Sequence, residues 1–191
     1  MTLFVVGLLL FLGVHCVSIV ARPWRDAQVQ RLGEGPWKGL YSVVALAGFV
    51  LMLYGYGLAR SAPVVLWTPP AFMRHVTALV MLPFFVLLLA AYVPGRIRTA
   101  ARHPMLLAVK LWAAAHLLSN GTLADVLLFG AFLAWAVIDR IALKRRGAGA
   151  VPTAGRARAA NDVVIVVLGL VLYVVFVGWG HRWLIGVSPM G

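Results

Sequence analysis

Four long runs of residues without a charged side chain constrain the fold of this chain more than any other feature. They cover residues 2–21, 39–59, 75–95 and 163–181. Each run comes close to the roughly 20 residues that an α-helix needs to cross about 30 Å of hydrocarbon. We therefore expect each run to form a helix that spans a membrane.

A fifth apolar stretch is about twice as long and is interrupted near its middle. It covers residues 103–143 and breaks around Asn120, so we expect two helices joined by a tight turn. Thr122 and Asp125 have the spacing of a capping box that begins the second of these helices. Because lipid offers no hydrogen-bond partner to an open strand, the sequence predicts an all-α integral membrane protein, a bundle of about six transmembrane helices.

The composition agrees with a membrane protein and excludes several other classes. Of the 191 residues, 63% are apolar and 12% are charged. A soluble domain is usually about 45–50% apolar and about 25% charged. Cys16 is the one cysteine of the chain, so an intramolecular disulfide, a four-cysteine zinc site and covalently attached c-type haem are all excluded.

The basic residues predict the orientation of the chain in the membrane. Of the 17 Lys and Arg residues, 13 lie in the segments after the first, third and fifth predicted helices, 3 lie on the other side, and Lys110 lies within a helix. Cytoplasmic loops carry an excess of Lys and Arg, so both termini are predicted to lie outside. We attribute the net charge of +12 to orientation and to attraction to an anionic lipid bilayer, and we expect no nucleic-acid partner.

The connections complete the predicted organisation. Apolar and charged residues alternate over residues 22–38, which is typical of a short helix lying in the membrane interface. We interpret residues 1–191 as a single transmembrane domain, in which residues 147–161 form a cytoplasmic loop and residues 162–185 form the last helix.

Two further patterns predict how the helices pack. Small and medium-sized residues recur along one face of the second predicted span, which is typical of close helix packing; they are Tyr41, Ala45, Gly48, Met52 and Gly55. Lys110 and Asp139 fall at similar depths on neighbouring helices, so an ion pair between them is one interpretation.

Histidines are the strongest candidates for a functional site. All five lie in or at the ends of the predicted helices, where an ionisable group is costly and therefore a functional hypothesis. Alternating helix directions place His15 and His103 toward the inner side, and His75 and His116 toward the outer side. Two histidines from different helices at one level can hold a b-type haem. His103 and His116 are about 20 Å apart along one helix, so they cannot both bind one metal.

Other interpretations of these side chains stay open. His181 is typical of a polar residue at the membrane surface, and the histidines need not share one role. Met73 with His75 is compatible with a copper site. Cys16, next to His15, is either a buried thiol or a soft metal ligand.

Several longer strings resemble the NnrU family of bacterial membrane proteins. They are RLGEGPWKGLYSVVALAGF, VVLWTPPAFMRH, AYVPGRIR, RHPMLLAVKLWAAAHLLSNG and LLFGAFLAWAVIDR, and the likeness covers most of residues 1–146. The resemblance implies a multi-pass protein of the bacterial inner (plasma) membrane, associated with nitric oxide and nitrite reduction in denitrification. It also implies a relation to the plastid 15-cis-zeta-carotene isomerase, a membrane haem b protein that isomerises a carotenoid double bond.

The resemblance carries three functional hypotheses. The first is a haem b protein of nitrogen-oxide metabolism with a membrane redox partner. The second is a haem-dependent isomerase of an apolar polyene, whose groove would be lined by Phe129, Phe132 and Trp135. The third is a non-catalytic assembly or copper-handling factor for a reductase. The family resemblance implies four cofactor-binding residues, which are His15, His75, His103 and His116. We expect His116 to be one iron ligand, with His75 as its partner by depth or His15 by family likeness.

Overall fold

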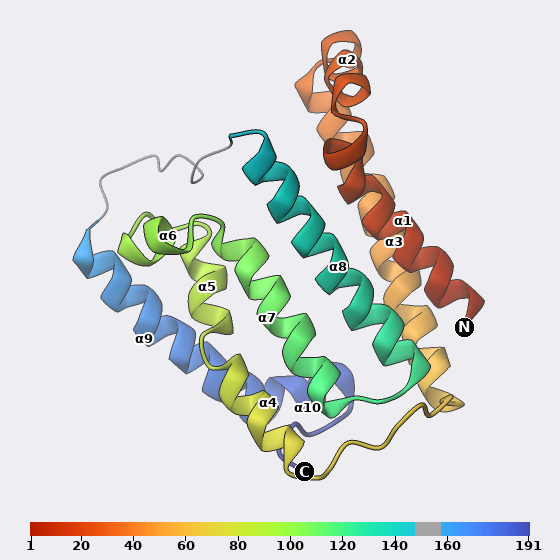
Figure 1. The fold of residues 1–191 in the computed structure, drawn as a ribbon, viewed down its shortest axis with the longest axis vertical. Helices are drawn as coiled ribbons and strands as arrows, with labels where there is room; N and C mark the ends of the chain where they lie inside the picture. Colours follow the sequence, from red (N-terminus) through yellow and green to blue (C-terminus); the bar gives the residue numbers. More distant parts are fainter. Residues whose placement is uncertain (148–157) are drawn as a thin grey trace. The chain divides into compact units, whose positions relative to one another are not determined.

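A computed structural model describes residues 1–147 and 158–191, and over these ranges the regular structure is helical (Figure 1). Within them, five helical segments are long and apolar enough to cross a membrane. They are α1 (Thr2–Val20), α3 (Glu34–Ser61), the pair α4 (Met73–Met81) and α5 (Phe84–Ala90), α8 (Leu123–Arg145), and the final segment Ala159–Ile185. The prediction of an all-α protein with membrane-spanning helices is confirmed.

One of the six predicted spans, the first helix of the stretch 103–143, is shorter than the others. It is α7 (Pro104–Ser119), whose 16 residues extend about 24 Å, less than the usual hydrocarbon thickness. The tight turn expected after it is confirmed, because α7 ends at Ser119 and α8 begins at Leu123. The orientation of the termini stays a prediction.

The chain divides into two compact units, and the single transmembrane domain stays a prediction. Unit 1 comprises Met1–Leu66 and Thr122–Leu128, and unit 2 comprises Trp67–Gly121 and Phe129–Gly191. The first turns of α8 therefore belong to unit 1 and the remainder to unit 2. Each unit is described by itself below.

Unit 1 is built on the close pairing of α1 and α3, which lie side by side (Figure 1). Glycines bring the two backbones together: a Cβ added at Gly7 would collide with the backbone of Met52, and one at Gly55 with the backbone of Phe4. At Gly48 an added Cβ would lie 2.6 Å from the backbone nitrogen of Phe11. The predicted packing stripe along α3 is therefore confirmed at these positions, which are buried.

The predicted interfacial helix over residues 22–38 is shorter than expected. The structure forms α2 (Arg22–Leu32), and the chain then turns at Gly33, where φ is +85°, before α3 begins. A side chain is strained at this φ, so the glycine is a natural break in the helix. Trp24 and Trp37 pack edge to face across the turn, with ring centroids 5.8 Å apart.

Unit 2 contains a helix that is broken by a proline. Pro83 has no N–H to donate, and α4 ends at Met81 with the Leu82 amide bonded to the Leu79 carbonyl instead of that of Ala78. The Ala78 carbonyl accepts a hydrogen bond from the hydroxyl of Tyr173 on α9 (Ala159–Val175) at 2.7 Å. A side chain from another helix thus satisfies the carbonyl that the break releases.

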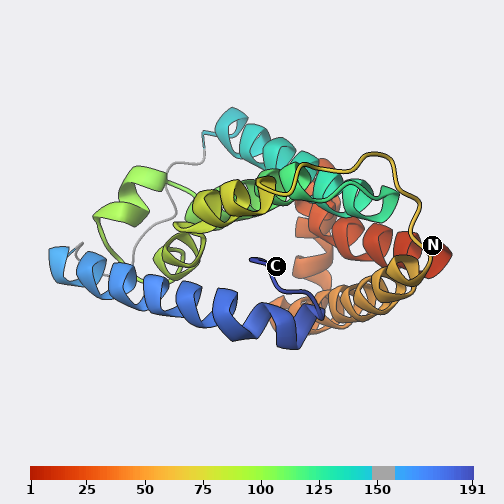
Figure 2. The same ribbon diagram turned by 90° about the horizontal axis from the view of Figure 1, so that it is seen from below.

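The C-terminal segment of unit 2 packs along α5 (Figure 2). A Cβ at Gly169 would lie 2.6 Å from the Val86 side chain, so the two helices approach closely. The last helix begins at Ala159, not at residue 162 as predicted, and continues through the π-helical turn η1 (Phe176–Gly180) into α10 (His181–Ile185). The predicted loop over residues 147–161 is correspondingly shorter, and most of it lies outside the described residues.

Asp162 on α9 caps the short helix α6 (Arg96–Ala101). Its carboxylate accepts hydrogen bonds from the backbone amides of Arg96 at 2.9 Å and Ile97 at 3.1 Å. These amides have no partner within their own helix, so an acidic side chain at this end is stabilising. A Cβ at Gly95 would collide with this carboxylate, which explains the glycine before α6.

The glycine contacts of unit 1 give a testable prediction. Gly55→Ala places a methyl group against the α1 backbone, and overpacking of this kind costs about 1–3 kcal/mol. Gly57→Ala lies two residues along α3, where an added Cβ meets nothing within 4 Å. We expect Gly55→Ala to lower the thermal unfolding temperature in detergent and Gly57→Ala to leave it unchanged or higher. Equal midpoints for the two variants would contradict the close backbone approach.

Candidate functional site

His116 lies in an aromatic cluster of unit 2, in the last turn of α7. Its ring stacks on Phe129 of α8, with centroids 4.8 Å apart. Trp112, one turn earlier on α7, packs edge to face against Phe129 at 5.0 Å and against Phe132 at 5.4 Å. The cluster gives the imidazole a half-buried, largely apolar environment.

A backbone hydrogen bond orients the His116 ring. Its Nδ1 lies 2.8 Å from the carbonyl oxygen of Trp112. A carbonyl oxygen can only accept, so the proton of the neutral ring is on Nδ1 and the lone pair is on Nε2. Metal-binding histidines are commonly oriented in this way, through a bond from the other ring nitrogen to a backbone carbonyl.

His15 in unit 1 has the same local arrangement. Its Nδ1 lies 2.6 Å from the carbonyl oxygen of Phe11, one turn earlier on α1. The ring also packs against the rings of Phe11 and Tyr41, at 4.4 Å and 5.4 Å between centroids. His15 is half-buried, and its Nε2 likewise carries the lone pair of the neutral ring.

His75 is placed differently from His116. Its side chain is exposed in the first turn of α4. The polar contact between α4 and α7 is made by the buried Thr77, whose hydroxyl donates to the Ala115 carbonyl at 2.8 Å. Residues two apart on a helix point in nearly opposite directions, so Thr77 occupies the face that packs on α7. The pairing of His75 with His116 stays a prediction.

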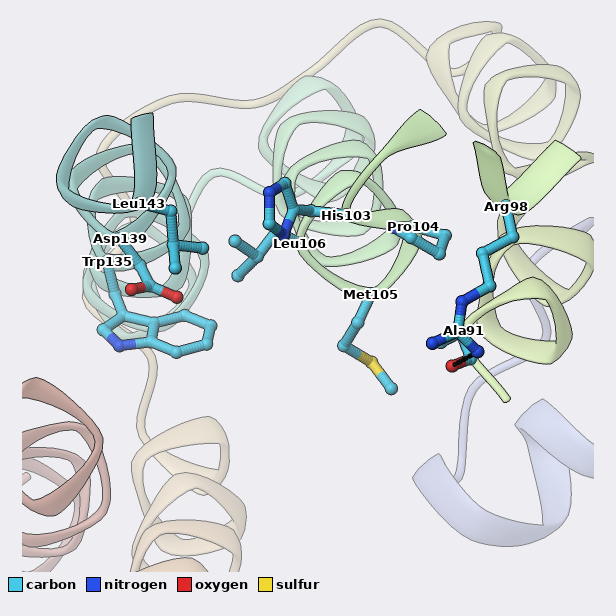
Figure 3. A pocket seen from close by; sticks show the side chains of 9 residues that line it. All are labelled: Ala91, Arg98, His103, Pro104, Met105, Leu106, Trp135, Asp139 and Leu143. Carbon is cyan, nitrogen blue, oxygen red and sulfur yellow. Dashed lines mark hydrogen bonds between the residues drawn. The ribbon is translucent and has the colours of Figure 1, made fainter. Parts of the chain in front are cut away.

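His103 lines a pocket at the opposite end of α7 from His116 (Figure 3). The pocket has a volume of about 290 Å³, and His103 is only 7% exposed. It lies in unit 2 and is lined by Ala91, Arg98, His103, Pro104, Met105, Leu106, Trp135, Asp139 and Leu143. His103 and His116 thus belong to two separate environments, as their spacing predicts.

Both charged residues that line this pocket interact with groups outside its lining or with its backbone. A nitrogen of Arg98 donates to the Ala91 carbonyl at 2.9 Å. The carboxylate of Asp139 lies 4.0 Å from a guanidinium nitrogen of Arg146, which directly follows the last residue of α8. The ion pair between Lys110 and Asp139 that we considered is therefore wrong: Arg146 is the basic partner that the structure brings to this carboxylate.

Asp125 is a buried acid in unit 1, and the predicted capping box is confirmed. Its carboxylate accepts from the amide of Thr122 at 3.1 Å, and its own amide donates to the Thr122 hydroxyl at 3.3 Å. The hydroxyl of Tyr56 on α3 donates to the same carboxylate at 2.5 Å. This second partner was not predicted, because nothing in the local pattern around Tyr56 indicates Asp125.

Candidate metal ligands do not gather in larger groups in the part of the chain that is described. Over residues 1–147 and 158–191, no three His, Cys, Asp or Glu side chains are placed so that they could hold one metal ion together. Two of the candidate histidines, His15 and His116, are half-buried beside aromatic rings.

Comparison with known protein families gives a match over nearly the whole chain. The model of the family described as NnrU protein matches residues 3–189. The match extends the expected likeness beyond residue 146 and through the last helix. No curated protein and no solved structure matches the chain.

The bond between Tyr56 and Asp125 gives a second prediction. Tyr56→Phe removes a hydrogen bond to a buried carboxylate, and bonds to charged groups are worth about 1.5–3 kcal/mol. Tyr54→Phe is the matched control, because Tyr54 is 62% exposed. We expect only Tyr56→Phe to lower the unfolding temperature in detergent. A loss of similar size in both variants would show that the hydroxyl of Tyr56 has no special role.

Proposed function

Because this chain belongs to the NnrU family of membrane proteins, we propose that it is a haem b protein that acts in nitric oxide and nitrite metabolism. The observation that carries this proposal is the orientation of His116. Its Nδ1 is committed to the Trp112 carbonyl, so the lone pair of Nε2 is the group that the ring offers to iron. Haem, when bound, supplies one-electron chemistry and an iron position for a small ligand such as nitric oxide.

The surroundings of His116 support an axial role. The Trp112 carbonyl makes the imidazole more basic by accepting a hydrogen bond from its Nδ1–H, and stacking on Phe129 restricts rotation of the ring. Phe132 and Trp112 add apolar surface beside it. Exclusion of water by such a shell tunes the potential of a bound iron.

The choice among the other histidines follows from the same chemistry. His15 has the same bond from Nδ1 to a backbone carbonyl and is a candidate for a second ligand. His75 is the candidate that shares unit 2 with His116. The pocket at His103 is at the lower end of the about 300–1,000 Å³ typical of small-molecule sites, so we do not place the haem there.

A pyridine hemochrome assay tests the proposal. We expect the purified full-length protein to give a b-type spectrum that His116→Ala abolishes, because the variant loses its axial nitrogen. His181→Ala is the matched control, since His181 also bonds a carbonyl through Nδ1, to Val187 at 2.6 Å. Parallel His15→Ala and His75→Ala variants identify the second ligand by a loss of haem content or by a changed absorption spectrum of the intact protein before pyridine is added.

Two results of this assay would overturn the proposal. A spectrum that persists unchanged in His116→Ala would remove His116 as a ligand. A wild-type protein without haem after expression with excess haem would favour the assembly or copper-handling alternative.

The isomerase alternative would require altered carotenoid isomer ratios in cells that accumulate the tri-cis precursor. Phe129 and Phe132, which it assigned to a polyene groove, pack against the Trp112 ring.

We also propose that the protein is a multi-pass protein of the bacterial inner membrane with both termini outside. The basis is the excess of Lys and Arg at one end of the helices, which includes Lys144 and Arg145 in the last turn of α8. Alkaline phosphatase, which is active only outside the cytoplasm, should be active when fused after Gly191 and inactive when fused after Gly147. The reverse pattern would invert the proposed orientation.

A further inference from the structure

The pocket at His103 brings together polar side chains from separate elements of unit 2. Figure 3 shows Trp135 and Asp139 of α8 on one side, His103 at the start of α7 in the middle, and Arg98 of α6 on the other side. Trp135 and Asp139 are four residues apart, so one face of α8 presents both to the pocket.

The chemistry of these groups selects a ligand that both donates and accepts hydrogen bonds. Arg98 is a donor, an ionised Asp139 is an acceptor, and His103 can serve as either. Asp139 is paired with Arg146 and Arg98 donates to the Ala91 carbonyl, so neither charge calls for an oppositely charged ligand and the lining suits a neutral one.

The remaining walls and the size of the pocket further restrict the class of ligand that it can bind. Apolar side chains form the rest of the lining, among them Met105, Leu106 and Leu143. The volume of about 290 Å³ suits one ring rather than a macrocycle. Met105 and Leu106 lie on α7 and Leu143 lies on α8, which are both apolar helices, so this lining suits a ligand with an apolar part.

We propose that this pocket binds the headgroup of a membrane quinone. A quinone is a neutral ring with two carbonyl oxygens, and its reduced form carries two hydroxyl groups. Arg98 and the indole N–H of Trp135 are suited to donate to the carbonyl oxygens of the oxidised form. Asp139 and His103 are suited to accept from the hydroxyl groups of the reduced form. We propose binding of the quinone and no reaction, and this binding does not depend on the presence of haem.

The experiment measures binding of decylubiquinone to the full-length protein in detergent by isothermal titration calorimetry. Leu143→Trp fills the pocket without changing its polar groups. Ile141→Trp is the matched control, because Ile141 is 45% exposed on α8 and does not line the pocket. We expect Leu143→Trp to weaken binding at least about tenfold, a loss of about 1.4 kcal/mol, and Ile141→Trp to bind as the wild type does.

A second variant tests the polar groups. Asp139→Asn keeps the shape of the side chain and removes its charge, so we expect binding of reduced decylubiquinol to weaken about tenfold. Equal heats in the wild type, Leu143→Trp and Ile141→Trp would overturn the proposal, because they would indicate partition into the micelle. Absence of quinone binding with saturable binding of phosphatidylglycerol would overturn it in favour of a lipid phosphate. Hemochrome content, measured on the same samples, reports separately on the proposed haem.

Discussion

In hydrocarbon every backbone carbonyl without a helical partner needs another donor, and several features of this protein depend on that requirement. The break at Pro83 releases the Ala78 carbonyl, and Tyr173 supplies the missing donor from α9. Asn161 donates in the same way to the carbonyl of Pro94, at 2.6 Å. These bonds join segments far apart in the sequence, so satisfying the backbone also determines which helices of unit 2 meet.

The same requirement links the fold to the candidate sites. His15 and His116 each donate a hydrogen bond from Nδ1 to a carbonyl one turn earlier on their own helix. A polar residue is thereby accommodated at half-buried positions, while its second nitrogen keeps a lone pair. The features that make these histidines tolerable in an apolar environment therefore also prepare them to bind a metal. At His103 the arrangement is different, because its ring lies among charged groups at the other end of α7.

Sequence reasoning predicted the features that depend on local pattern. Helix positions followed from apolar runs, the turn around Asn120 from its polar residues, and the contact at Gly55 from the spacing of small side chains. The capping box of Thr122 and Asp125 is likewise a matter of spacing within four residues.

Sequence reasoning missed the contacts between distant segments. Tyr56 and Asp125 are 69 residues apart, and Tyr173 lies 95 residues from Ala78. No periodicity relates such pairs, because their proximity depends on how helices pack. Asp139 shows the same difficulty at shorter range. Depth alone suggested Lys110, whereas the structure brings Arg146 to this carboxylate. The pocket at His103 could have been suspected from Trp135, Asp139 and Leu143, which share one face of α8.

The cap on α6 has a consequence for how the chain assembles. The carboxylate that accepts from the amides of Arg96 and Ile97 belongs to Asp162, which the ribosome adds some 65 residues later. During synthesis the start of α6 must rely on water for these hydrogen bonds, and only the arrival of α9 replaces that water. The short helix and the final helix are therefore expected to become ordered together, as one late step of biogenesis.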